Sequence, residues 1–165
     1  MFSKISRIFF TVFVLTYPVV DIKVWNRKAN SSYIDISGRT PLHLAASVGR
    51  DDVVTFLLRH MTDKMPQDAF GWSPLHFSSY DGHLNTTKIL LDAIGNNSSY
   101  ITQHSYETDN YHTPLHWAAR QGKTSIVKLF LDRIVGDKNP KNKPGFKVII
   151  HKSRGEQDTI ECGFF

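Results

Sequence analysis

Three short stretches of this sequence share one pattern, and that pattern decides the fold. They read Thr40-Pro41-Leu42-His43, Ser73-Pro74-Leu75-His76 and Thr113-Pro114-Leu115-His116. The first two begin 33 residues apart and the last two begin 40 apart, so the second interval holds seven extra residues. Because Pro-Leu-His at a given place has a chance on the order of 10⁻⁴ from average residue usage, three aligned copies indicate an internal repeat.

Each copy predicts a pair of helices. A hydroxyl residue followed by proline favours a helix start, since the hydroxyl oxygen can accept from an unpaired N–H and proline has no N–H to leave unpaired. Gly49, Gly82 and Gly122 come eight residues after the prolines, where a left-handed residue would end a helix of about two turns. Apolar residues at helical spacing, such as those in 53–58, then predict a second helix.

This unit resembles the ankyrin repeat, a turn followed by two antiparallel helices with the signature Thr-Pro-Leu-His-x-Ala. The resemblance covers residues 35–134 and implies an all-α repeat solenoid, an ankyrin-repeat array of stacked helix-turn-helix units. It also implies that the signature histidine joins adjacent repeats through hydrogen bonds to backbone, and that a pair of alanines lets neighbouring helices approach. In the second repeat Ser78 and Ser79 replace that pair, so two hydroxyls need partners.

The chain divides into three parts. Residues 1–34 are a hydrophobic segment and degenerate cap repeat, residues 35–135 are the ankyrin-repeat domain with repeats at about 35–67, 68–107 and 108–135, and residues 136–165 are an aborted fourth repeat and polar tail. At the last boundary Gly145-Phe146 echoes Gly71-Trp72, but residues 147–150 read Lys-Val-Ile-Ile in place of the signature. A short complete protein and a fragment of a longer ankyrin protein both fit this pattern.

The N-terminal segment has the layout of a signal peptide. Lys4 and Arg7 precede apolar residues at 8–20, but this stretch is too short to span a bilayer, and no Ala-x-Ala-like site follows it. A signal peptide, a short membrane-associated anchor and a degenerate cap or spurious segment therefore remain as alternatives, and we favour the last. Membrane contact through residues 8–20 is the alternative that we do not favour.

The positive net charge of +5 lies in the flanks. Residues 1–34 carry +4, residues 35–136 carry −1 and residues 137–165 carry +2. A nucleic-acid-binding groove needs basic residues clustered on the folded part, so we expect no nucleic-acid partner. Cys162 is the only cysteine, so no intrachain disulfide can form, which fits a reducing compartment and a cytoplasmic or otherwise intracellular location.

The seven extra residues fall in the stretch 95–106. In repeat arrays such insertions map to loops on one face, often the binding face, which would make Tyr100 and Tyr106 recognition residues. The alternative, which we favour, is a flexible insertion that is tolerated because surface loops accept length at small entropic cost.

No catalytic or metal site is expected. His112 and His116 have the spacing of a helical metal pair, but His112 precedes the helix start, so the two do not share a helical face. No nucleophile elbow or phosphate-binding glycine loop occurs. We therefore expect no enzyme activity, no cofactor, no metal and no small-molecule ligand.

The remaining function is protein binding. Family members contact partners through the turn tips and the open face of the first helices, which here implies Arg39, Ser47, Val48, Phe70, Trp72, Tyr80, Asp81, Tyr111, His112, Arg120 and Gln121. Aromatic and arginine residues dominate binding hot spots, so we favour the aromatic members at 70, 72, 80 and 111 together with Arg120. The alternative for Phe70 and Trp72 is packing against a neighbouring tip.

We accordingly expect an interaction module or scaffold for an unidentified protein partner. Two other classes stay open. The first is a secreted or membrane-associated ankyrin protein. The second is a fragment of a larger ankyrin-containing signalling, channel or enzyme protein.

Overall fold

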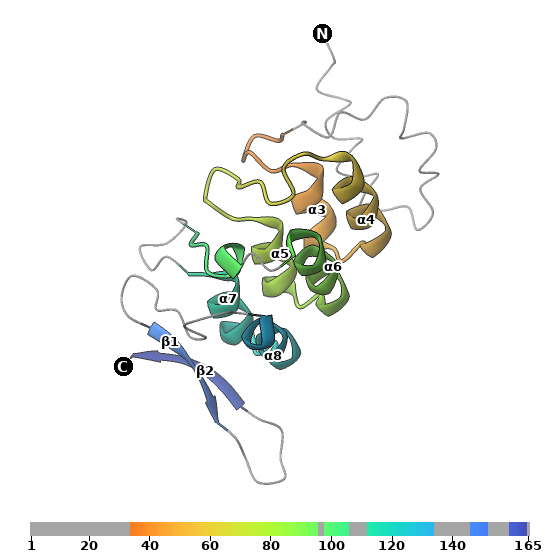
Figure 1. The fold of residues 1–165 in the computed structure, drawn as a ribbon. Helices are drawn as coiled ribbons and strands as arrows, with labels where there is room; N and C mark the ends of the chain where they lie inside the picture. Colours follow the sequence, from red (N-terminus) through yellow and green to blue (C-terminus); the bar gives the residue numbers. More distant parts are fainter. Residues whose placement is uncertain (1–33, 96–97, 106–111, 134–145, 152–158, 165) are drawn as a thin grey trace.

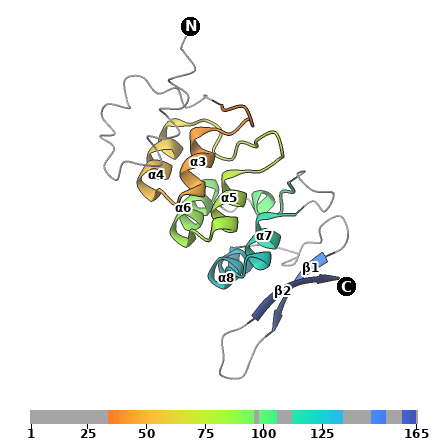
Figure 2. The ribbon, with the colours of Figure 1, turned by 180° about the vertical axis from the view of Figure 1, so that it is seen from behind.

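The computed structural model describes residues 34–95, 98–105, 112–133, 146–151 and 159–164. Its helices are α3 (Pro41–Ser47), α4 (Asp51–His60), α5 (Pro74–Asp81), α6 (Leu84–Ile94), α7 (Pro114–Arg120) and α8 (Thr124–Arg133), with a 3-10 turn η1 (Ser98–Tyr100) after α6. Figure 1 shows that α3, α5 and α7 lie in one row and α4, α6 and α8 in a second, and the reverse view in Figure 2 shows the same order. The helices therefore form three stacked pairs, as predicted for an ankyrin array.

The three signature stretches start the inner helices α3, α5 and α7, as the sequence predicts. In each, the backbone N–H before the proline donates to the Nδ1 atom of the signature histidine, for example from Thr40 to His43 at 3.0 Å. Gly49, Gly82 and Gly122 have φ angles of 69°, 92° and 66°, in the left-handed region that glycine enters without steric cost. Each inner helix therefore ends where its glycine was expected to end it.

Apolar residues from both rows of helices form one continuous core. The signature leucines Leu42, Leu75 and Leu115 have no exposed surface. The outer helices add fully or almost fully buried side chains, namely Val54, Leu57, Leu90, Leu91, Ile126, Val127 and Phe130. Burial of each large aliphatic side chain contributes about 1.5–3 kcal/mol, so the contact between neighbouring repeats stabilises the array.

The serine pair of the second repeat is fully buried, and its hydroxyls find partners inside the same repeat. Ser78 Oγ donates to the Leu75 carbonyl at 3.4 Å and accepts from Thr87 Oγ1 at 3.0 Å. Ser79 Oγ also donates to the Leu75 carbonyl. Because these bonds satisfy both hydroxyls, the replacement of alanine leaves no buried hydroxyl without a partner at these two positions.

A two-stranded antiparallel hairpin follows the helices. Strand β1 (Phe146–His151) pairs with β2 (Thr159–Phe164), with Val148 opposite Cys162, and both strands contact α7. The sequence predicted an aborted fourth repeat here. Residues 147–150 lack the hydroxyl-proline start of a helix and are mostly β-branched, which favours the extended conformation.

The described helices are short. The longest, α6, has 11 residues, and none of the helices in the described ranges has the length and apolar character needed to cross a bilayer. The predicted alternatives for residues 8–20, and for the whole segment up to residue 33, lie outside the described residues.

Candidate functional site

Equivalent positions of α3, α5 and α7 form one face of the array, which we call the inner-helix face. It comprises Leu44, Ser47 and Val48 in the first repeat, Phe77, Tyr80 and Asp81 in the second, and Trp117, Arg120 and Gln121 in the third. Tyr80 is 38% exposed, and Asp81, Arg120 and Gln121 are exposed. The face thus changes from small aliphatic and polar side chains in the first repeat to aromatic and charged ones in the other two.

Five rings pack together beneath and within this face, and we call them the aromatic cluster. Its members are Trp72, Phe77, Tyr80, His112 and Trp117. The two tryptophan rings lie 5.1 Å apart, and Tyr80 lies 5.7 Å from Trp72 and 5.4 Å from Trp117. Aromatic pairs at these distances add about 0.5–1.5 kcal/mol beyond the burial of their area, so the cluster fixes the second repeat against the third.

Charged groups border the aromatic cluster. The Arg120 guanidinium lies 5.7 Å from the centre of the Trp117 ring, in the range of a cation–π contact. Burial raises the pKa of the Asp81 carboxyl, against the opposing influence of His83 and Lys123. The Nε1–H groups of Trp72 and Trp117 are buried and have no hydrogen-bond acceptor among the described residues.

The first two turn tips are built by one aspartate each. Asp35 Oδ1 accepts from the backbone N–H groups of residues 37 and 39 at 2.8 and 2.9 Å, and Asp68 Oδ1 accepts from those of residues 70 and 72 at 2.9 and 2.8 Å. A further bond, from Ala69 N–H to the Ser37 carbonyl at 3.0 Å, joins the two tips. Each carboxylate therefore holds its tip closed, and the tips are placed side by side.

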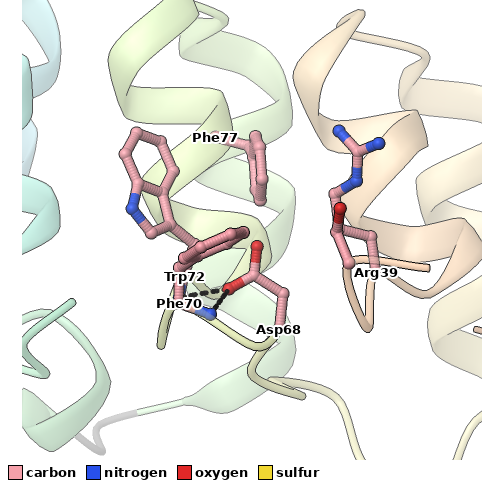
Figure 3. Close-up of a pocket in the computed structure, with 6 residues that line it drawn as sticks. Arg39, Asp68, Phe70, Trp72 and Phe77 are labelled. Atoms are coloured by element: carbon pink, nitrogen blue, oxygen red, sulfur yellow. Dashed lines mark hydrogen bonds between the residues drawn. The ribbon is translucent and has the colours of Figure 1, made fainter. Parts of the chain in front are cut away.

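A hollow of about 160 Å³ lies between these tips and α5. It is lined by Ser37, Arg39, Asp68, Phe70, Trp72 and Phe77. Figure 3 shows Phe70 and Trp72 on one side of the Asp68 carboxylate, Arg39 on the other and Phe77 above it. The Arg39 guanidinium is paired with Asp35, with 2.8 Å between Nε and Oδ2.

The first junction between repeats depends on His43. Because its Nδ1 accepts from the Thr40 N–H, the neutral ring carries its proton on Nε2, which donates to the Trp72 carbonyl at 3.0 Å. Burial lowers the pKa of His43, so the ring is neutral at pH 7. This bond confirms the implied role of the signature histidine at the first junction.

The second junction differs. His76 has the same contact with the N–H of the preceding serine, but its Nε2 has no hydrogen-bond partner among the described residues. The carbonyl of His112, the counterpart of Trp72, accepts instead from Ser105 N–H at 2.9 Å and from Ser105 Oγ at 3.0 Å. Since one residue occupies both lone pairs of that carbonyl, the implied bond from His76 is missing.

Burial dominates the titration of these histidines. It lowers the pKa of His76 to about 3, while the nearby backbone of Gln103 and His112 acts in the opposite direction without reaching hydrogen-bonding geometry. Burial likewise lowers the pKa of His112 to about 4, with smaller contributions from His116 and Arg120. Both rings are therefore neutral at pH 7.

Comparison with known proteins decides the family. A family model described as ankyrin repeats in three copies matches residues 26–100 and 60–143. The chain belongs to the ankyrin-repeat family. Among similar proteins, an ankyrin repeat-containing protein of Schizosaccharomyces pombe is 43% identical over 118 residues, which cover 69% of this chain and 47% of that protein.

Other relatives are much longer proteins. Alpha-latrotoxin-Lg1a of Latrodectus geometricus is 27% identical over 85% of this chain and 10% of its own length. The human transient receptor potential cation channel subfamily A member 1 is 45% identical over 35% of this chain and 5% of its own length. The chain thus spans less than half the length of each of these three relatives.

Two of the predicted contact residues are buried in the ankyrin array. Trp72 is 7% exposed and His112 is 4% exposed, whereas both were expected at open turn tips. Both rings pack against the ring of Trp117, which lies in the inner helix of the following repeat for Trp72 and of the same repeat for His112. The burial of so large an apolar area outweighs exposure at the tip. The alternative considered for Trp72, packing against its neighbours, is the one observed.

The other predicted contact residues remain open to a partner. Phe70 is 47% exposed, and Tyr80, Asp81, Arg120 and Gln121 are also exposed. Arg39, Ser47 and Val48 are partly exposed. Tyr111 lies outside the described residues. The exposed candidates therefore border the aromatic cluster or lie at the second tip.

Two residues beside the predicted contacts were not predicted from sequence, namely Phe77 and Trp117. Each directly follows a signature histidine, at the position that Leu44 occupies in the first repeat. The signal was available in the repeat alignment, since an aromatic residue at that register lies beside the exposed positions three residues further along the same helix.

The insertion is anchored at two points. Ile101 is 2% exposed within the core, Tyr100 is partly buried against it, and Ser105 has no exposed surface. Tyr100 therefore contributes to packing, while Tyr106 lies outside the described residues. No group of three or more His, Cys, Asp or Glu side chains able to hold a metal forms within the described part of the chain.

Proposed function

We propose that this array binds a protein partner through its inner-helix face, with Tyr80 and Arg120 as the main contacts. Ankyrin repeats generally mediate protein binding. The observation that carries the proposal is the position of these two exposed side chains against buried tryptophans, with Tyr80 on both rings and Arg120 over Trp117. Hot spots of protein interfaces are enriched in Tyr, Trp and Arg held rigidly in place.

We further propose that the array itself catalyses no reaction and that the protein resides in a reducing, intracellular compartment. The basis for the location is the single cysteine of the chain. Asn85, in the motif Asn85-Thr86-Thr87, is exposed on α6, so a secreted form would be open to glycosylation there. An intact mass without glycan, measured on protein from its natural source, supports the intracellular location, and a glycan at Asn85 overturns it.

The binding proposal is tested with the double variant Tyr80→Ala, Arg120→Ala. A partner is first captured from the native source, identified and purified, and its affinity is then measured by titration calorimetry. We expect the double variant to weaken binding by more than ~2 kcal/mol with an unchanged helical circular dichroism spectrum. Trp72 is left intact because its replacement would disturb packing between repeats.

The matched control is Arg59→Ala, Lys88→Ala, which removes two exposed side chains from the outer helices α4 and α6. We expect this control to bind the partner as the wild type does. Equal losses in the two double variants, or a loss only in the outer one, would show that the inner-helix face is not the binding surface.

A second candidate is that the array serves as the recognition segment of a longer protein. The observation that favours it is the length of the relatives, among them a cation channel subunit, a latrotoxin and the tyrosine-protein kinase HTK16 of Hydra vulgaris, of which the chain covers 13%. An antibody raised against residues 35–135 tests it. A single band near the 18.8 kDa of this chain would oppose the candidate, and a much larger band would support it.

A further inference from the structure

We propose that the hollow between the first two tips receives the ammonium group of a lysine side chain from the protein partner. The proposal rests on the proposed function, because it assigns one chemical feature to that partner. Its basis is the combination of an unpaired carboxylate with three aromatic walls in one concave site.

The charge of the hollow favours a cation. Asp68 is 9% exposed and forms no ion pair with any described residue. Its Oδ1 atom is occupied by two backbone N–H groups, and Figure 3 shows its other oxygen turned toward the side of the hollow where Phe77 lies. The positive charge of Arg39 is already neutralised by Asp35, so one negative charge in the hollow remains without a partner.

The walls reinforce this preference. Phe70, Trp72 and Phe77 line the hollow, and the Trp72 and Phe77 rings lie 4.9 Å apart at 53°. The faces of aromatic rings carry negative partial charge and attract cations. With about 160 Å³, against roughly 30 Å³ for a water molecule in the liquid, the hollow has room for the end of a long side chain.

The geometry of Asp68 distinguishes lysine from arginine. A guanidinium group gains its advantage by binding both oxygens of a carboxylate with parallel hydrogen bonds. Because Oδ1 of Asp68 is fully used by the tip, only one oxygen is available. A compact ammonium with freely rotating donors fits a single acceptor, so the site is assigned to lysine.

The test titrates the full-length, ¹⁵N-labelled chain with three probes at constant ionic strength, namely n-butylammonium, n-butylguanidinium and n-butanol. The signals followed are the Trp72 indole N–H and the Phe70 backbone N–H, which donates to Asp68. We expect saturable shifts with butylammonium, binding about fivefold weaker with butylguanidinium, and no saturation with butanol.

Two variants and one control complete the test. Asp68→Asn keeps the Oδ1 acceptor of the tip and removes the charge, and is expected to weaken butylammonium binding about tenfold. Phe70→Leu keeps an apolar side chain and removes one ring, and is expected to weaken it about twofold to threefold. Asp132→Asn removes an exposed charge from α8, outside the hollow, and is expected to have no effect.

The assignment is overturned by a butanol response equal to that of butylammonium, by unchanged binding in Asp68→Asn, or by tighter binding of butylguanidinium. Dispersed spectra of each variant show whether the fold is kept, and if Asp68→Asn unfolds, Phe70→Leu decides the question. These probes need no partner. Failure of the hollow to bind ammonium leaves the Tyr80 and Arg120 result intact, and failure of that partner experiment leaves the probe result intact.

Discussion

The two junctions between repeats are built from the same signature but differ in the hydrogen bond of the signature histidine. At the first junction the Trp72 carbonyl accepts from the Asp68 N–H at 2.9 Å and from His43 Nε2 at 3.0 Å. At the second, the His112 carbonyl accepts from the N–H and the hydroxyl of Ser105, and His76 Nε2 is left without an acceptor among the described residues.

The difference comes from the residue whose backbone N–H donates to each of these carbonyls. Asp68 turns its carboxylate onto the N–H groups of its own tip and leaves the Trp72 carbonyl free to accept from the preceding repeat. At the second junction the N–H of Ser105 donates to the equivalent carbonyl, and the Ser105 hydroxyl donates to the same oxygen. The signature fixes where a helix begins, but the bond between repeats depends on residues outside the signature.

The largest expected effect is the loss of a signature histidine. His43→Ala removes a fully buried ring together with its bonds to Thr40 and Trp72, and we expect the free energy of unfolding to fall by about 4 kcal/mol. His76→Ala creates a similar cavity but breaks no bond at Nε2, and we expect a loss of about 3 kcal/mol. Urea unfolding followed by circular dichroism measures both. Equal losses, or a greater loss for His76, would contradict the proposed difference between the junctions.

Much of this architecture could be predicted from sequence. Local chemistry sets the helix starts and ends. A hydroxyl residue and a proline favour a helix start, at Pro41, Pro74 and Pro114, and a glycine in the left-handed conformation ends the helix, at Gly49 and Gly82. These features depend on residues that are close in sequence. The structure accordingly has them where the pattern puts them.

The candidate site was less predictable because its residues depend on contacts between repeats. Trp72 stands two residues before its helix in sequence, and only the position of Trp117 in the next repeat shows that its ring is covered. The missing bond of His76 depends on how the insertion places Ser105. Side-chain burial at a turn tip is set by the neighbouring repeat, which a single copy of the motif does not describe.

The next effect concerns pH and separates His76 from the other groups. Its pKa falls from the ordinary 6.5 to about 3 on folding, so between these values the unfolded chain binds a proton that the folded chain does not. Stability therefore decreases as pH falls below about 6.5, and His76 alone accounts for a loss on the order of 3 kcal/mol at pH 4.

The measurement is urea unfolding at pH 7 and pH 4 for the wild type and for His76→Gln, in which the side-chain oxygen can still accept from the Ser73 N–H. We expect the variant to lose much less stability than the wild type over this range. Parallel pH curves for the two proteins would show that His76 is not the group responsible.

A smaller effect separates the glycines of the first and third repeats. Both have left-handed φ angles, 69° at Gly49 and 66° at Gly122, so replacement by Ala costs about 1 kcal/mol from the backbone alone. A Cβ atom at Gly49 would also lie 2.5 Å from Nδ1 of His83, whose Nε2 bonds the Ser47 carbonyl across the first junction at 2.9 Å, whereas one at Gly122 would meet nothing within 4 Å.

We therefore expect Gly49→Ala to lower the free energy of unfolding by about 2 kcal/mol and Gly122→Ala by about 1 kcal/mol. Thermal unfolding by calorimetry, with both variants under identical conditions, checks the order. The reverse order would mean that the His83 ring moves aside without loss and that the first junction is looser than its hydrogen bonds indicate.

The smallest expected effect is that of Ser105→Ala, which acts on the difference between the junctions directly. The variant removes one bond to the His112 carbonyl and frees a lone pair for His76 Nε2, so the loss of one bond is offset by the gain of another. We expect a net change below ~1 kcal/mol in the free energy of unfolding.

The double variant Ser105→Ala, His76→Ala shows whether the offset occurs, because without the His76 ring nothing replaces the lost hydroxyl. Its loss should exceed the sum of the two single losses by about 1 kcal/mol, and simple additivity would show that His76 does not take the freed acceptor.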